Sequence, residues 1–598
     1  MKLNINKLML VGGLALASMT QSCSLDEVNP GGFTLEQLAT DPKGFETLLN
    51  NCYFGMQRKY YNDIDFMRFT EANTDLWTYA ANQNGKNDQM FMFFYGAATP
   101  NLTFTNGLWN SAYDGIGACN MVLKTIGSCP FSSEDIRLRK EAEARFLRAV
   151  YYYNIVEIYG GVAALTQVLD VNFAPARTEP VDIYRDIIIP DMEFAIKYCE
   201  KGDDAATARP YKKAALGMYA KMCLQSSQYT DEFLQRGFDA AKELISDCES
   251  GGNKYGAYMY PTFDDVFAEA NNMNNKEALW KYSLFADASG YGCSNGAQNL
   301  NRNDEHFLCN IYKFAAREDS QDSRLQWDGG IAGDFMPTQY LLNLFVQADG
   351  TLDPRFHKSF NCQWNSNRAY SWTEGDIAIY KKDASIKDTP IAVGDLAIKF
   401  VMPQDADYAA EVAGRGTSNY LLVDYKDVYD DATKSIIMQN DAKNGENQLR
   451  YYYPSLSKHN SSNRWTANAS KKRNGNKNAL FVMRMAEVYL IAAEYDLLLN
   501  GGGQAATYLN KVRTRAGVPA VSNVTMRTIL DERARELCGE FTRFYDLKRT
   551  GMFKDASYLQ ETHPFLAQYF KPEYALRPIP QGYTDVITNG ASWQNPGY

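Results

Sequence analysis

The stretch EAEARFLRAVYYYNIVEI, residues 141–158, decides the fold of this chain. Its large side chains recur at steps of three and four residues, which is the spacing of one face of an α-helix. Glycines at positions 160 and 161 follow, and glycine commonly ends a helix. The stretch therefore predicts a long amphipathic helix whose main face holds Leu147, Tyr151, Asn154 and Ile158, flanked by Phe146, Val150 and Tyr153.

Similar patterns recur toward both ends of the chain. Short breaks separate the last of them, at Gly501-Gly502-Gly503 and at Gly517-Val518-Pro519. Amphipathic helices joined in pairs by short turns are typical of helical-repeat proteins. We therefore expect a mainly α fold on a tetratricopeptide-like scaffold, with helices at 108–126, 181–199, 211–229, 481–499, 504–515 and 525–538.

The middle of the chain, from about residue 250 to 475, has a different composition. It is rich in glycine, asparagine, aspartate and serine, with short apolar pieces such as 278–285 and 391–402. We expect long loops and a few short strands there. Loops of this length in a compact protein are usually functional or disordered.

The N-terminus resembles a secretory signal. Lys2 and Lys7 precede an apolar run at 8–19, which is too short to cross a membrane as a helix. The small residue Ser22 precedes Cys23, so cleavage before Cys23 and acylation of its thiol are expected. Thr20 departs from this pattern, because bacterial lipoprotein signals usually carry leucine there. An ordinary signal peptide cut nearby, or a chance cysteine, remains the alternative.

Composition narrows the classes of partner. The 598 residues carry a net charge of −10 and no basic run, which disfavours nucleic acid and anionic lipid surfaces. The eleven cysteines are scattered without a C-x-x-C pair, so buried free thiols are favoured, and any disulfide connectivity stays open. Aromatic residues make up 13% of the chain, enough to supply flat binding surfaces as well as a core.

Signals for catalysis are weak. Residues 292–296 read G-C-S-N-G around Ser294, but a nucleophile elbow needs a strand before it and a helix after it, and neither pattern is present. The four histidines have no metal-binding spacing, and no phosphate-binding glycine loop occurs. No catalytic residue, cofactor or metal site is therefore predicted. A glycoside hydrolase built on two carboxylates stays an alternative, because sequence does not show their separation.

Residues 531–549 are dense in charge. Glu532, Glu536 and Glu540 recur every four residues, with arginines between them. Carboxylates on a helix can act as acids or bases, but more often they pair with arginine and fix one helix against another. We therefore interpret this segment as structural.

Aromatic residues in the predicted loops suggest ligand binding. Trp77 and Tyr79 lie among amide side chains in EANTDLWTYAANQN, residues 71–84, and Tyr291, Trp327, Trp364 and Trp372 lie in later loops. A flat ring can stack on a sugar ring or on a peptide side chain, while neighbouring amides orient the ligand. Each tryptophan can instead pack against the scaffold and hold its own loop in place.

An ordered set of motifs runs along the chain. They are Cys23–Asp26, Trp109-x-x-x-Tyr113-x-x-Ile116 with Asn120, Ala144–Ala149 continuing to Tyr159-Gly160-Gly161-Val162, Asp349–Arg355, Arg484–Leu490 with Glu494, Asn510–Gly517, Glu532–Leu537, Arg543–Arg549, Arg577–Pro580 and Gln594–Tyr598. Each motif is weak alone, but in this order they resemble the SusD/RagB family of surface nutrient-binding lipoproteins, with Cys23–Asp26 similar to its lipidated start.

The resemblance implies a tetratricopeptide-like scaffold without enzymatic activity. It also implies a partner, a SusC-type TonB-dependent outer-membrane transporter, over which the lipoprotein sits as a lid. Asp26 and Glu27 fit the acidic export signal of such lipoproteins. Family members that bind glycans place aromatics before the W-x-x-x-Y helix and in the variable loops, and here those zones hold the candidate ligand residues Trp77, Tyr79, Asn82, Tyr291 and Trp327.

These inferences predict a cell-surface, outer-membrane lipoprotein that binds a complex glycan or its oligosaccharides and passes them to the transporter. The same architecture binding peptides is the alternative. The expected regions are 1–22 signal peptide, 23–40 acylated N-terminus and tether, 41–250 N-terminal helical region, 251–475 variable ligand-binding region and 476–598 C-terminal helical region.

Overall fold

The structure is a computed structural model of the whole chain. It describes residues 35–61, 64–72, 74–79, 100–101, 103–168, 172–202, 208–282, 307, 335–366, 369–438, 447–458, 464–466, 474–476 and 478–598. The predicted signal peptide, Cys23 and the G-x-S-x-G segment around Ser294 lie outside these residues.

The N-terminal helices form a stack in chain order. Helix α8, Glu134–Tyr159, contains the stretch that predicted the fold; Ser133 caps its start and Gly160 ends it with φ 79°. Helix α7, Thr103–Thr125, packs against α8, and α8 packs against α10, Ile189–Tyr198. The stack continues through α11, Lys212–Gln225, to α12, Leu234–Glu249.

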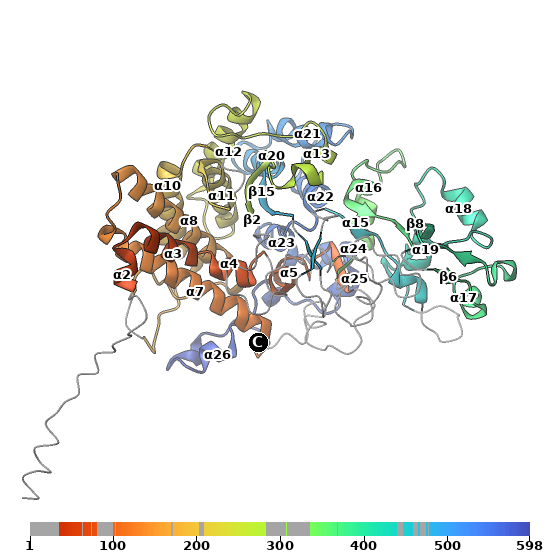
Figure 1. Cartoon of the computed structure of the whole chain (residues 1–598), viewed down its shortest axis with the longest axis horizontal. Helices are drawn as coiled ribbons and strands as arrows, with labels where there is room; N and C mark the ends of the chain where they lie inside the picture. Colours follow the sequence, from red (N-terminus) through yellow and green to blue (C-terminus); the bar gives the residue numbers. More distant parts are fainter. Residues whose placement is uncertain are drawn as a thin grey trace, which may run out of the picture.

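The C-terminal helices extend the same stack. Helix α20, Met485–Asn500, packs against α12, and both α21, Ala505–Arg515, and α22, Met526–Leu537, pack against α20 (Figure 1). The chain therefore leaves the helical stack after residue 249 and rejoins it at residue 485. This arrangement confirms the predicted mainly α scaffold.

One predicted helix begins later than its pattern indicated. Residues 480–484 form strand β15, which pairs with β2, Ala278–Tyr282, and the helix starts only at Met485. A short apolar run fits a buried strand or a buried helix equally well, so the pairing partner decides.

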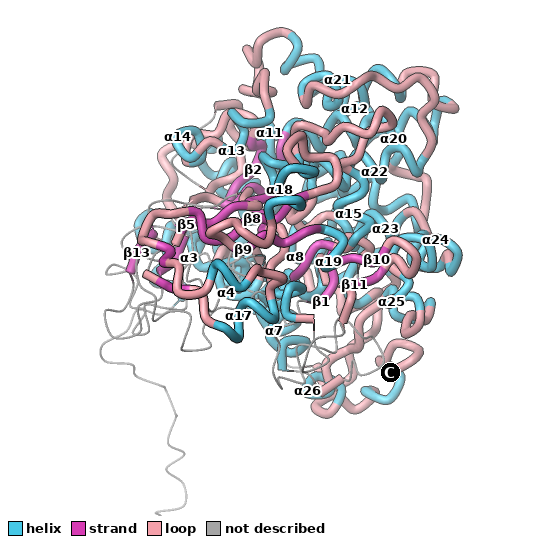
Figure 2. The backbone as a smooth tube through the Cα atoms, turned by 90° about the vertical axis from the view of Figure 1, so that its right-hand side faces the viewer, coloured by secondary structure: helices cyan, strands magenta, loops and turns pink. Residues whose placement is uncertain are grey.

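Short strands and helices make up the described part of the middle region. Strands β5, Gln363–Asn365, β8, Leu396–Val401, and β9, Leu421–Asp424, form a three-stranded sheet beside α18, Tyr408–Gly414 (Figure 2). Strand pairing is otherwise two-stranded among the described residues: β1 (Trp77–Tyr79) with β3 (Phe335–Pro337), β4 (Phe360–Asn361) with β12 (Ser455–Leu456), β6 (Tyr370–Ser371) with β7 (Pro390–Ile391), β10 (Tyr429–Asp430) with β11 (Ser435–Ile436), β13 (Arg464–Thr466) with β14 (Asn474–Asn476), and β2 with β15.

Shorter helices complete the fold. They are α2 (Leu35–Ala39), α3 (Pro42–Asn51), α4 (Phe54–Lys59), α5 (Ile64–Thr70), α9 (Pro180–Ile183), α13 (Phe263–Phe267), α14 (Glu269–Asn272), α15 (Gln339–Leu344), α16 (Phe356–Ser359), α17 (Glu374–Ile379), α19 (Tyr425–Val428), α23 (Arg543–Arg549), α24 (Ala556–Thr562), α25 (Pro564–Ala567) and α26 (Gln581–Thr584). No helix within the described ranges has both the length and the hydropathy needed to cross a bilayer.

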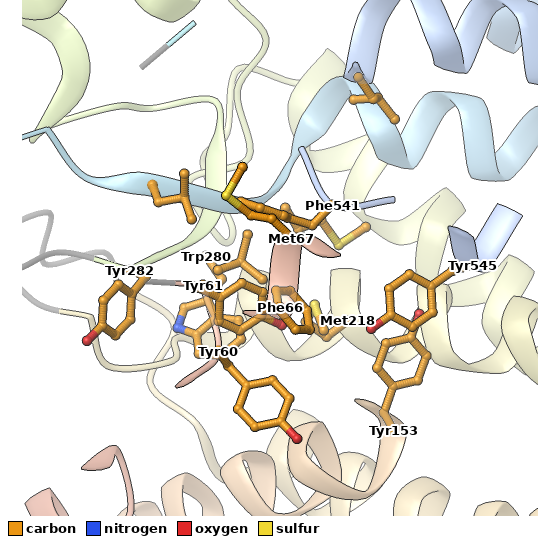
Figure 3. Packing of buried hydrophobic residues seen from close by; sticks show 14 of the residues in the cluster. Tyr60, Tyr61, Phe66, Met67, Tyr153, Met218, Trp280, Tyr282, Phe541 and Tyr545 are labelled. Atoms are coloured by element: carbon orange, nitrogen blue, oxygen red, sulfur yellow. The ribbon is translucent and has the colours of Figure 1, made fainter. Parts of the chain in front are cut away.

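Aromatic side chains from distant segments meet in the core (Figure 3). The Tyr61 ring lies 6.1 Å from the Trp280 ring and 6.4 Å from the Phe541 ring, and the Phe146 ring lies 4.9 Å from the Trp280 ring. Eight cysteines of the described chain are free thiols, seven of them buried. This agrees with the interpretation of scattered cysteines as core residues.

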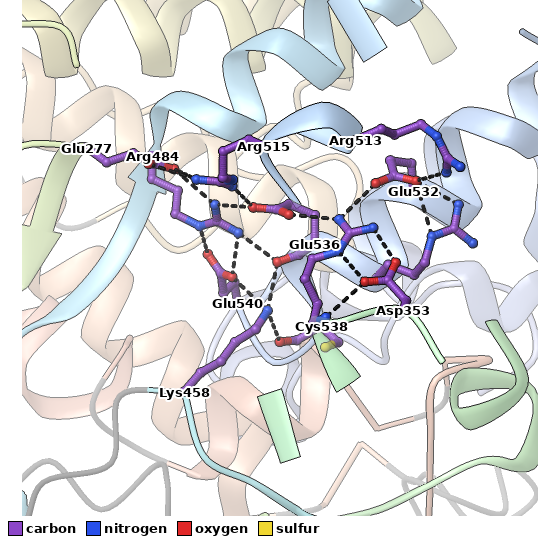
Figure 4. A network of polar contacts seen from close by, with 12 residues as sticks. Glu277, Asp353, Lys458, Arg484, Arg513, Arg515, Glu532, Glu536, Cys538 and Glu540 are labelled. Carbon is purple, nitrogen blue, oxygen red and sulfur yellow. Dashed lines mark hydrogen bonds and ion pairs between the residues drawn. The ribbon is translucent and has the colours of Figure 1, made fainter. Parts of the chain in front are cut away.

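The acidic residues of α22 and the turn after it are structural, as predicted (Figure 4). Glu536 accepts from Arg484 at 2.6 Å and from Arg355 at 2.9 Å, and Glu540 pairs with Arg484 at 2.8 Å; all are buried. Burial alone would raise the pKa of Glu532, but the guanidinium groups of Arg355, Arg535 and Arg513 hold it below its ordinary value. These carboxylates fix α22 to the middle region.

Candidate functional site

A two-stranded ribbon brings together the two segments that hold the candidate ligand residues. Strands β1 and β3 pair antiparallel, with Tyr79 opposite Phe335 and Trp77 opposite Pro337. The Thr338 amide extends the pairing by donating to the Leu76 carbonyl at 2.9 Å. Residue 80, which follows Tyr79 in the chain, and residue 334, which precedes Phe335, are therefore attached to neighbouring positions of this ribbon.

Trp77 is part of the core and offers no face to a ligand. Its exposed fraction is 0%, and its indole N–H donates to Glu71 Oε2 at 2.9 Å. Its ring lies 4.5 Å from Phe307 and 6.5 Å from Phe360. The prediction that Trp77 stacks on a ligand is therefore wrong. Its side chain instead packs β1 against Phe307 and Phe360 in the core.

The other candidates sit on the segments that this ribbon joins. Tyr79 ends β1, and the structure describes its backbone only. Asn82, Tyr291 and Trp327 lie outside the described residues. Two further tryptophans that the sequence places in loops, Trp364 and Trp372, are buried. Trp364 lies in strand β5 and Trp372 directly follows β6, so each packs its own segment against the fold.

Phe307 is an anchor that sequence reasoning missed. It is the only described residue between 283 and 334, and its exposed fraction is 2%. Its ring lies between those of Trp77 and Phe335, 5.2 Å from the latter. Nothing in the local sequence distinguishes it from the other phenylalanines, because its partners are distant in the chain.

Glu71 is a second residue that sequence reasoning missed. It is 1% exposed, and burial raises its pKa to about 8. The side-chain atom Oε1 has no hydrogen-bond partner. Burial therefore favours the uncharged form of this carboxyl, which is bonded to the β1 residue Trp77.

A cavity of about 960 Å³, lined by polar and apolar side chains, lies next to the Trp77 ring. Phe360, which contacts Trp77, also lines the cavity, together with Asn361, Gln363, Lys399, Gln404 and Asp407. We call it the β4–β8 cavity, because β4 and β8 form its walls and the turn at 402–407 closes one side. No sequence motif marked it.

A second cavity, of about 710 Å³, lies where α7 meets residues 163–168 and 172–175 and α26. Aromatic rings of Trp109, Tyr113 and Tyr583 line it, but several of its polar groups are already bonded. The Tyr113 hydroxyl accepts from the Ala163 amide at 3.0 Å, and Asn120 donates to the Leu165 carbonyl at 2.9 Å. These contacts hold the neighbouring loop and leave fewer groups for a ligand.

Solved structures with the same fold include glycan-binding proteins. A "Laminarin binding SusD-like protein" has a TM-score of 0.62 and 20% identity, and the match covers 94% of this chain and 100% of that one. Surface glycan-binding protein A from Bacteroides thetaiotaomicron, in complex with laminarihexaose, has a TM-score of 0.60 and 18% identity, covering 93% and 100%. At this identity the likeness concerns the fold.

Proteins related to this chain in sequence are named as SusD-like or starch-binding proteins. "SusD-like protein P25" of Formosa agariphila is 25% identical over 460 residues, which cover 75% of this chain and 70% of the relative. "Starch-binding protein SusD" of Bacteroides thetaiotaomicron is 36% identical over 124 residues, covering 20% and 21%.

Family models match both ends of the chain. The model described as "Starch-binding associating with outer membrane" matches residues 35–224. The model described as "SusD family" matches residues 276–598, more than half of the chain and including the β1 partner strand β3 and the buried charge network. This chain therefore belongs to the SusD family.

Proposed function

We propose that this chain is a non-catalytic glycan-binding protein of the outer membrane. One observation carries the proposal: Tyr79 pairs with Phe335, so the two segments that hold Asn82, Tyr291 and Trp327 join the fold side by side. Aromatic rings and amides on adjacent loops supply both the stacking faces and the hydrogen bonds that sugar binding requires.

The names of its relatives support a sugar as the ligand class. The relatives include a starch-binding protein, and the structural neighbours include a laminarin-binding protein and a laminarihexaose complex. The names of these distant relatives refer to different glucans. Such variety is expected where variable loops bind the ligand on a common scaffold. Within the described chain, the motifs in α8, α20 and α22 belong to helices or to buried ion pairs of the scaffold, so we assign the choice of ligand to the segments between them.

Membrane association and delivery complete the proposal. Cys23 is the proposed acylation site after removal of residues 1–22, and one of the two matching family models is described as associating with the outer membrane. The lipidated chain faces the cell exterior and passes its oligosaccharides to a SusC-like TonB-dependent transporter. Stable anchoring of this kind needs more than one acyl chain.

Isothermal titration of the full chain in detergent tests the ligand class. The probes are laminarihexaose, maltohexaose, soluble starch, and a mixture of casein peptides. We expect heat with one glycan class, lost in Trp327→Ala and kept in Phe173→Ala, an exposed aromatic residue of another surface loop. Heat with the peptides alone would replace the glycan by a peptide as ligand.

A further inference from the structure

The second cavity, which we call the α7–α26 cavity, is kept open by a glycine. Helix α26 lies beside α7 (Figure 1), and Gly117 in the middle of α7 is exposed and lines the cavity. A Cβ at Gly115 would strike the Tyr151 ring, but a Cβ at Gly117 would meet no atom within 4 Å. Glycine inside a helix costs about 1 kcal/mol relative to alanine, so packing explains Gly115 and leaves Gly117 unexplained. A missing side chain lets a ligand approach the backbone closely.

Two half-buried tyrosine rings line the same cavity. The Tyr583 ring of α26 lies 4.9 Å from the Trp109 ring and 5.1 Å from the Trp593 ring, and both tryptophans are buried. The Tyr113 ring lies 5.2 Å from the Trp109 ring. The Tyr583 hydroxyl has no hydrogen-bond partner within the described chain. Both rings are therefore held in place by packing and are ready to stack on a ligand without a further loss of side-chain freedom.

Exposed polar side chains accompany these rings in the lining. Asn110 and Asp114 lie one turn apart on α7, and neither has a hydrogen bond or an ion pair among the described residues. Gln167 is likewise exposed and unbonded within that part of the chain. Asn172 uses only Oδ1, which accepts from the Ala174 amide at 2.9 Å, so its Nδ2 donor stays open. A ligand can bond to these groups by displacing water alone.

The charge of the cavity favours a neutral ligand. Its lining has two charged residues, and one of them, Lys59, is paired with Asp65 at 2.8 Å. The other is Asp114, whose carboxylate repels an anion. A sugar can donate hydroxyl groups to this carboxylate, bond to the amides, and place its C–H face on a tyrosine ring.

We infer that the α7–α26 cavity is a second binding site, for a neutral sugar chain. Its volume of about 710 Å³ lies within the usual range for small-molecule sites. The inference rests on the proposed glycan binding and extends it to residues outside the proposed ligand loops. Because the polar groups of the cavity are exposed to water, we expect a Kd of about 1 mM, too weak to give heat in the titration that tests the loop site.

One segment of the chain connects the two sites. Tyr79 ends β1 in the ribbon, and the Pro100 carbonyl accepts from the Gln581 amide of α26 at 3.0 Å. Residues 80–99 therefore run from the ribbon to the helix that carries Tyr583. A glycan held at both sites would contact the protein at both ends of this segment.

Ligand-observed saturation-transfer NMR detects binding of this strength. The full-length Trp327→Ala variant, which removes the proposed loop contact, is mixed with laminaritriose, maltotriose or a mannuronate trisaccharide. We expect transfer to a neutral trisaccharide and none to the acidic one. Adding Gly117→Leu fills the cavity and should abolish the transfer, whereas adding Gly117→Ala, which places only a methyl group there, should keep it.

Crystals soaked with the same trisaccharides locate the site. We expect a sugar ring on Tyr583 or Tyr113, bonded to Asn110 or Asp114. In solution, Asn110→Ala should weaken binding about threefold to tenfold, the usual effect of losing one hydrogen bond. Asn51→Ala, at an exposed position of α3 that does not line the cavity, is the matched control and should bind as the parent. A sugar seen only at crystal concentration, without transfer in solution, would overturn the second site.

Equal transfer in the Gly117→Leu and Gly117→Ala variants would reject the second site and leave the proposed function intact. Equal transfer to the acidic and neutral trisaccharides would reject the neutral ligand class. Absence of glycan binding in the titration as well as in the NMR experiment would reject both proposals. Unfolding is excluded as a cause by the melting temperatures, because Gly117→Leu introduces no clash at Cβ and should melt no lower than wild type.

Discussion

Asp75 and Arg543 form a buried, two-bond ion pair across 468 positions of the chain. Arg543 donates from Nε to Asp75 Oδ1 at 2.8 Å and from Nη2 to Oδ2 at 2.6 Å, and the Tyr558 hydroxyl donates to the same carboxylate at 2.5 Å. Asp75 lies two residues before β1. Helix α23 of the C-terminal region thus holds the strand from which the proposed ligand loop departs.

Arg543→Met is expected to lower the free energy of unfolding by about 3–5 kcal/mol, because it leaves the Asp75 carboxylate buried without its cation. Urea denaturation measures the change. The control is Arg139→Met, whose partner Glu200 and own side chain are about half exposed, and which should change stability by less than about 1 kcal/mol. Equal effects in the two variants would mean that the buried pair contributes no more than a surface pair.

Glu71 should make stability depend on pH. Its pKa is about 8 in the folded chain against an ordinary 4.5, because burial disfavours the charged form. Between these values only the folded state holds the proton, so stability falls as pH rises from about 4.5 to about 8, by at most about 1.4 kcal/mol per pH unit.

Glu71→Gln removes this titration and should flatten the decline, as measured by urea denaturation at a series of pH values. Glu374→Gln, an exposed carboxylate of α17 with 87% side-chain exposure, should leave the wild-type slope unchanged. A slope in Glu71→Gln as steep as in wild type would assign the pH dependence to other groups.

Alanine substitutions at two glycines of α7 should change the stability of the fold in opposite directions. A Cβ at Gly115 would lie 2.2 Å from Tyr151 Cζ, and that ring is fixed because its hydroxyl bonds the Cys52 carbonyl and the Met56 amide. Gly115→Ala should therefore destabilise by about 1–3 kcal/mol or more. Gly117→Ala meets no atom within 4 Å and should stabilise by up to about 1 kcal/mol, because alanine favours the helix. Thermal melting of both variants checks the contrast, and a shared sign would contradict it.

The scaffold was predictable because its information is local. Helical spacing identified α8, and the glutamates of α22 at every fourth residue indicated the ion pairs that Arg355 and Arg484 complete. Residues 481–484 are strand and not helix as predicted, because an apolar run has no period of its own and their strand character depends on β2, about 200 residues earlier.

The site was less predictable because burial is decided by distant partners. Trp77 lies in a polar stretch, as a ligand-binding tryptophan would, and only Phe307 and Phe360 reveal that its ring is covered.

Trp77 and Trp327 should separate stability from binding. Trp77→Ala leaves a cavity beside the Phe307 and Phe360 rings and removes the donor to Glu71, so it should destabilise by about 3–5 kcal/mol. Trp327→Ala, at the proposed stacking position, should leave the melting temperature within a degree or two while weakening glycan binding by tenfold or more. Titration and melting of both variants at a temperature where each is folded make the comparison. A Trp327 variant that binds normally would remove this residue from the site, and a Trp77 variant as stable as wild type would show that its ring does not support the ribbon.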